Sequence, residues 1–243
     1  MKKIIVLFLA LACLLSLAAC GKQGDGGSAG ETVAGDVDAL AVKDAEYLAE
    51  ALKLRDQESD NLVFQAKDFS LTRELYENRV EAAMLSGITR EEAEQYVLGY
   101  VVVRTMYSAA QEAGIKPDDA AFQEHVSTTR QYIESLIAAD NPDDGSHYVK
   151  VFFDEMEKLG IVEDYWELNT DFLWVSDTIA VFTQNLHDSY VARAGEDANE
   201  NTWMQLCIEF TRNELEEQNV QFASDISWEL TGANYHSDLW PAL

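Results

Sequence analysis

The chain has 243 residues, of which 47% are hydrophobic and 10% aromatic, so it can bury a sizeable core and is expected to form one folded domain. It carries 17 basic residues against 44 acidic ones, a formal net charge of −27. A surface this acidic repels phosphate backbones and anionic headgroups, which argues against nucleic acid as a partner and against a polybasic contact with lipid.

The chain begins with a short export leader. Lys2 and Lys3 give it a positive start, and residues 4–19 form an almost unbroken apolar run that is too short for a comfortable membrane span. Small residues precede Cys20, and this arrangement resembles the lipobox of bacterial lipoproteins. The resemblance implies a signal peptide over residues 1–19 and a diacylglyceryl anchor on Cys20. An ordinary secretory leader and an uncleaved signal anchor are the alternatives.

Residues 20–36 form a lipidated cysteine followed by a flexible, glycine-rich tether with a reach of ~20 Å. Removal of the leader takes Lys2 and Lys3 and no acid, which leaves 15 basic and 44 acidic residues and a net charge of −29. We expect the acyl anchor to hold the protein at the extracytoplasmic face of a membrane, with residues 37–243 as a single domain beyond the tether.

The spacing of apolar residues predicts an all-α fold, an irregular bundle of about six to seven helices. The predicted helices lie near residues 37–52, 70–86, 89–113, 117–139, 149–159, 162–192 and 202–218. The segments 62–64 and 220–222 can form a short two-stranded β element. No pattern is evident in the tail after residue 222.

Several helix ends have clear signals. Thr89-Arg90-Glu91-Glu92 is a capping box that starts a long, widely covered helix, and Gly114 ends that helix. Pro117 is expected in the first turn of the next helix, where its fixed φ suits the helix start. Gly160 is expected to stop the helix over 149–159.

The sequence favours no reactive centre. Residues 140–151 resemble a calcium loop only superficially, because Pro142 and Val151 replace ligands. The four histidines are scattered, so neither a metal nor any cofactor is expected, and we name no catalytic residue. Cys207 is the only cysteine left once Cys20 is lipidated and the leader is lost, and its apolar helical face predicts a buried, inert thiol.

The helix over 162–192 carries more aromatic residues than one buried stripe needs. Most of them are expected in the core, but the surplus can also line a groove that holds apolar segments of other proteins. Trp166 and Trp174 are the candidate peptide-binding residues.

Three stretches occur in an order that resembles the N-terminal chaperone domain of SurA and PrsA, exported foldases related in design to trigger factor. A capped helix near Ser70 leads to the Thr89 capping box; the junction Ala110-Gln111-Glu112-Ala113-Gly114-Ile115-Lys116-Pro117-Asp118-Asp119 follows, and Leu159-Gly160-Ile161-Val162-Glu163-Asp164-Tyr165-Trp166 opens the later helix. The resemblance covers residues 69–222 in pieces.

In that family a parvulin isomerase domain separates the N-terminal helices from a returning C-terminal helix, whereas here only residues 194–201 lie between them. The resemblance therefore implies a chaperone-like holdase for unfolded or exported polypeptides, without isomerase activity. The alternatives are a scaffold lipoprotein with one fixed protein partner and, with less support, a peripheral enzyme or ligand receptor. The sequence does not fix the oligomeric state.

Overall fold

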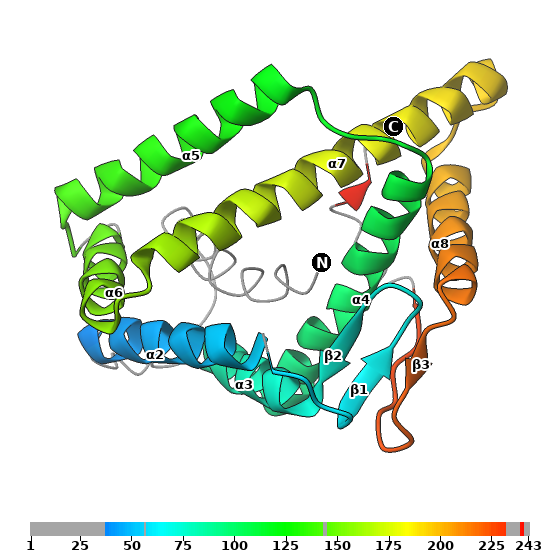
Figure 1. Cartoon of the computed structure of the whole chain (residues 1–243). Helices are drawn as coiled ribbons and strands as arrows, with labels where there is room; N and C mark the ends of the chain where they lie inside the picture. The colour runs from blue at the N-terminus through cyan, green and yellow to red at the C-terminus, as the bar shows by residue number, and fades with distance from the viewer. Residues whose placement is uncertain (1–36, 56, 143–144, 232–238, 241–243) are drawn as a thin grey trace, which may run out of the picture.

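The computed structural model describes residues 37–55, 57–142, 145–231 and 239–240. The leader, Cys20 and the tether to residue 36 lie outside the described residues, so those expectations stay predictions. The described residues form seven α-helices and a small three-stranded sheet, which confirms the mostly-α class (Figure 1).

The helices vary widely in length, and α7 is the longest. They are α2 (Val37–Arg55), α3 (Arg73–Met84), α4 (Arg90–Glu112), α5 (Asp119–Ala139), α6 (Ser146–Leu159), α7 (Val162–Ala194) and α8 (Glu200–Glu217), with a 3-10 turn η1 (Gly195–Asp197) before α8. The strands are β1 (Leu62–Gln65), β2 (Ser70–Thr72) and β3 (Gln221–Phe222).

The sheet joins the two ends of the described fold. Its order is β2-β1-β3, with both pairs antiparallel, and Phe64 lies opposite Phe222 in the β1–β3 pair. The expected pairing of 62–64 with 220–222 is therefore confirmed. Strand β2 was not predicted. Of the two residues expected to cap the next helix, Ser70 and Thr72, it is Thr72 that caps α3, by accepting from the N–H of Leu75 at 3.4 Å, while Ser70 pairs with Gln65.

Helix α4 is the central element. At its start, Glu92 accepts from the Thr89 N–H at 2.8 Å, while the Thr89 hydroxyl oxygen accepts from the Glu92 N–H at 3.3 Å. Every residue from 97 to 110 is buried, and α4 packs against α3, α7 and α8. The predicted capping box and the predicted central helix are thus both present.

Helices α2, α5, α6 and α7 make the other half of the structure. Helix α6 packs against α2 and α5, and α7 runs from the α6 end across to α8 (Figure 1). Helix α5 starts one step later than expected: Asp118 is its N-cap and accepts from the N–H groups of Ala120 and Ala121, so Pro117 precedes the cap. Asp118 is the N-cap because its carboxylate accepts hydrogen bonds from two backbone N–H groups, and proline has no side-chain acceptor for them.

The tail after β3 covers α8. The ring of Trp240, 9% exposed, lies 5.7 Å from Trp203 and 5.9 Å from Phe210, and Trp228 lies 5.6 Å from Phe222. This packing was not foreseen, because isolated tryptophans in an aperiodic tail carry no helix or strand signal.

Candidate functional site

Helix α7 carries both tryptophans predicted to bind peptides. Gly160 ends α6 in a left-handed conformation with φ 70°, which glycine adopts without strain, and α7 starts at Val162. Trp166 and Trp174 lie ~12 Å apart along the helix axis. Since they sit on different stretches of α7, each has its own set of neighbours.

Trp166 is partly buried and contacts both the core and a cation. Its ring centroid lies 5.6 Å from that of Phe153 and 5.2 Å from that of Tyr165. The guanidinium carbon of Arg130, on α5, lies 4.8 Å from the indole centroid, which is a cation–π distance. Arg130 also pairs with Glu134 through its Nε at 3.0 Å.

An open, shallow depression of about 430 Å³ surrounds Trp166. Apart from Trp166 and Thr170, its lining is carboxylates: Glu163, Asp164, Glu167 and Asp171. We call this surface the Trp166 depression. An aromatic ring surrounded by carboxylates can bind a lysine or arginine side chain. The cation lies on the ring, and the methylenes of the side chain cover apolar surface.

Trp174 is also partly buried but has a different environment. Its ring meets that of Phe122, on α5, edge to face at 4.9 Å, and Trp174 does not border the Trp166 depression. Nearby, His125 of α5 lies 3.0 Å from an Asp177 carboxylate oxygen on α7. The middle of α7 therefore packs against α5 through these two contacts.

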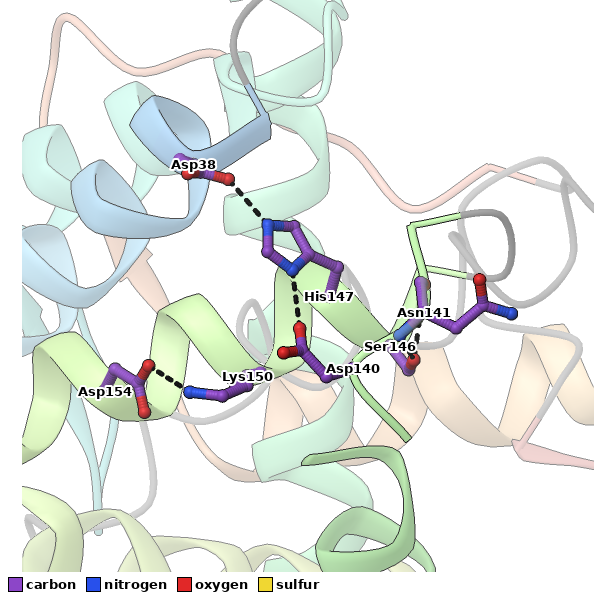
Figure 2. A network of polar contacts seen from close by, with 7 residues as sticks. All are labelled: Asp38, Asp140, Asn141, Ser146, His147, Lys150 and Asp154. Atoms are coloured by element: carbon purple, nitrogen blue, oxygen red, sulfur yellow. Dashed lines mark hydrogen bonds and ion pairs between the residues drawn. The ribbon is translucent and has the colours of Figure 1, made fainter. Parts of the chain in front are cut away.

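His147 joins three helices at one point (Figure 2). Its Nδ1 lies 2.6 Å from Asp140, the C-cap of α5, and its Nε2 lies 2.9 Å from Asp38 in the first turn of α2. A neutral imidazole has one N–H, so only the imidazolium can donate to both carboxylates. The hydrogen bonds to Asp140 and then to Asp38 raise the His147 pKa.

The same network uses polar groups at both ends of the turn before α6, within the segment that superficially resembles a calcium loop. Asp140 has φ 43° and is committed to His147, and the Ser146 hydroxyl oxygen accepts from the Asn141 N–H at 2.6 Å. In the part of the chain that the structure describes, no three His, Cys, Asp or Glu side chains are grouped as metal ligands.

A buried polar cluster links α2, α3 and α6. The Tyr148 O–H donates to the Asp44 carboxylate, and Arg79, 2% exposed, acts on Asp44 through its charge. Burial raises the Asp44 pKa to about 7 although Arg79 opposes the shift, and burial lowers the Arg79 pKa to about 9. Asp44 therefore changes its charge near neutral pH.

Cys207 is 1% exposed, and burial raises its pKa to about 12. The predicted burial of this thiol is confirmed. Cys20, the predicted lipid attachment point, lies outside the described residues.

None of the helices over the described residues is long and apolar enough to cross a membrane. No protein-family model matches the chain, and comparisons with curated proteins and with solved structures also give no match. The resemblance to the SurA and PrsA chaperone domain consequently stays a prediction.

The sequence analysis named Trp166 but did not identify the charged residues that surround its ring. Arg130 lies on another helix, and nothing local relates it to α7. The run of acids beside Trp166, at 163, 164, 167 and 171, follows helical spacing and was a usable signal.

Proposed function

We propose that the protein is a lipid-anchored lipoprotein on the extracytoplasmic face of a membrane, whose helical domain binds segments of unfolded or newly exported polypeptides. The proposal includes no catalysis, no isomerase activity and no cofactor. The leader that ends directly before Cys20 supports the anchor, and the glycine-rich tether supports a domain that can move relative to the membrane.

The observation that carries the binding proposal is the Trp166 depression. Arg130 already places a guanidinium on the indole, and four carboxylates line the depression around it; a basic residue of another chain would take the place of Arg130 on the ring. A client segment rich in lysine or arginine with apolar neighbours fits this surface. After loss of the leader, 15 basic and 44 acidic residues give a net charge of −29, which adds a long-range attraction that speeds association at low salt.

Holdase activity is tested by aggregation. The protein, purified from membranes in a mild detergent, is mixed with several unrelated unfolded proteins, and light scattering is followed. Protection of several clients supports the proposal. Protection of none, together with one exported protein that co-purifies stoichiometrically, would replace it with the scaffold alternative.

Two matched substitutions separate the tryptophans. Trp166→Leu should weaken binding of a lysine-rich peptide about fivefold, the loss expected for one exposed cation–π contact. Trp174→Leu makes the same chemical change on the same helix, against Phe122, and should leave peptide affinity unchanged. Fluorescence anisotropy of a labelled peptide measures both. Equal effects from the two variants would remove the Trp166 depression from the proposal.

A further inference from the structure

A second pocket lies where α2 ends and the sheet begins. It has a volume of about 280 Å³, is partly enclosed, and shares no lining residue with the Trp166 depression. Pockets that bind small ligands start near this size. Three leucines form much of its apolar wall: Leu54, Leu62 and Leu75.

Arg104 of α4 reaches this pocket from the core. It is 3% exposed, and its guanidinium carbon lies 5.8 Å from the Phe69 ring centroid and 5.4 Å from the Tyr107 ring centroid. The two rings hold the guanidinium in place. Its Nη1 is buried and has no hydrogen-bond partner.

Over the residues that the structure describes, no carboxylate balances the charge of Arg104, although the chain has 44 acidic residues. Tyr100, one helical turn away, hydrogen-bonds with the Arg104 side chain, but burial raises the Tyr100 pKa to about 12, so this neighbour stays neutral and supplies no counter-charge. A buried cation without a counter-charge is costly unless an anion comes to it.

The other lining groups limit which anion fits. Ser70 and Thr72 of β2 place hydroxyls in the pocket, and Thr72 uses its oxygen as the α3 cap, which leaves its proton to donate. Arg55 lines the pocket too, at the end of α2, and exposed Glu58 and Asp60 offset its charge, so the pocket disfavours groups that carry two negative charges. The leucine wall favours an apolar body behind the charge.

We propose that this pocket binds a singly charged carboxylate on a small apolar group, with the Arg104 guanidinium as its cationic partner. Guanidinium and carboxylate match in shape and can form two parallel hydrogen bonds. The same chemistry occurs in a small branched-chain acid and at the C-terminus of a polypeptide. The inference does not depend on peptide binding at the Trp166 depression.

Calorimetry on the full chain in mild detergent tests the pocket with N-acetyl-leucine and its uncharged analogue N-acetyl-leucinamide. The acid should bind at least about tenfold more tightly than the amide, and Arg104→Gln should remove that preference. Arg90→Gln is the control, because it removes an exposed guanidinium at the start of the same helix. Equal binding of acid and amide, or no binding of either at about 10 mM, would refute the proposal.

Because Arg104 is buried, its variant can fail to fold, so the unmodified protein provides a second measurement. The Nε–Hε NMR signal of Arg104 should shift when N-acetyl-leucine is added and should not shift with the amide. Inorganic phosphate that binds as tightly as the acid would overturn the assignment to a singly charged carboxylate. If isovalerate binds as tightly as N-acetyl-leucine, the ligand is a free acid. If isovalerate binds more weakly, the ligand is a polypeptide C-terminus. Both results support the pocket.

Discussion

Asp44→Asn should remove much of the pH dependence of the fold's stability between about pH 5 and about pH 8. Asp44 is partly buried beside Arg79 and Tyr148, and burial raises its pKa from 3.8 to about 7. A carboxyl whose pKa is raised in the folded state stabilises that state when protonated. The stabilisation is complete below the unfolded pKa and is lost as pH rises through the folded pKa.

The size of the effect follows from the two pKa values of 3.8 and about 7. Each pH unit inside that window costs about 1.4 kcal/mol, so full ionisation removes about 4 kcal/mol. Between about pH 5 and about pH 8, roughly 3 kcal/mol of this remains to be lost. The amide of asparagine cannot ionise, so the variant avoids the loss.

Urea unfolding followed by circular dichroism, at constant ionic strength, measures the free energy of unfolding of both proteins. The free energy of unfolding of Asp44→Asn, relative to that of the parent, should rise by about 3 kcal/mol between about pH 5 and about pH 8. Comparing the two proteins cancels the general effect of the acidic surface, and exposed Asp60→Asn corrects for loss of one charge. A difference between the two free energies of unfolding that stays constant with pH, or that falls as pH rises, would refute the placement of Asp44 in a desolvating environment.

Two further substitutions test contacts between distant segments. His147→Gln should destabilise the fold at acidic pH and have little effect above the raised His147 pKa, because the imidazolium bridge to Asp38 and Asp140 exists only in the protonated state; thermal melts across pH measure this, and a pH-independent loss would contradict it. Phe64→Ala should cost about 3–5 kcal/mol in urea unfolding, because its 1% exposed ring packs on Phe69 and Phe222; exposed Val191→Ala is the control, and a cost below about 1 kcal/mol would contradict the packing.

Local signals made most of the helices predictable. The Thr89 capping box and the left-handed Gly160 depend on residues within one turn, so the sequence contains the whole cause. The pairing of 62–64 with 220–222 was also predicted, whereas β2 was not. Strand β2 has only three residues, too few to show an alternating pattern, and it forms through its pairing with β1.

The polar interior was harder to predict, because it depends on which helices meet. Asp44 and Arg79 look like ordinary solvated residues on α2 and α3, and only the packing of α2 against α3 and α6 takes them out of water. Arg104 did carry a signal, since it interrupts the apolar run that starts at Val101. A charge inside such a run on a widely covered helix indicates a buried cation that needs a partner.

The antiparallel pair of β1 and β3 also constrains how the molecule is made. Strand β1 is synthesised early. Its partner at Gln221 and Phe222 is synthesised only after all helices from α2 to α8. Trp240, which covers Trp203, follows later still. Nascent chains cut short before β3 should therefore remain open and protease-sensitive, and closure becomes an event of the last moments of translation.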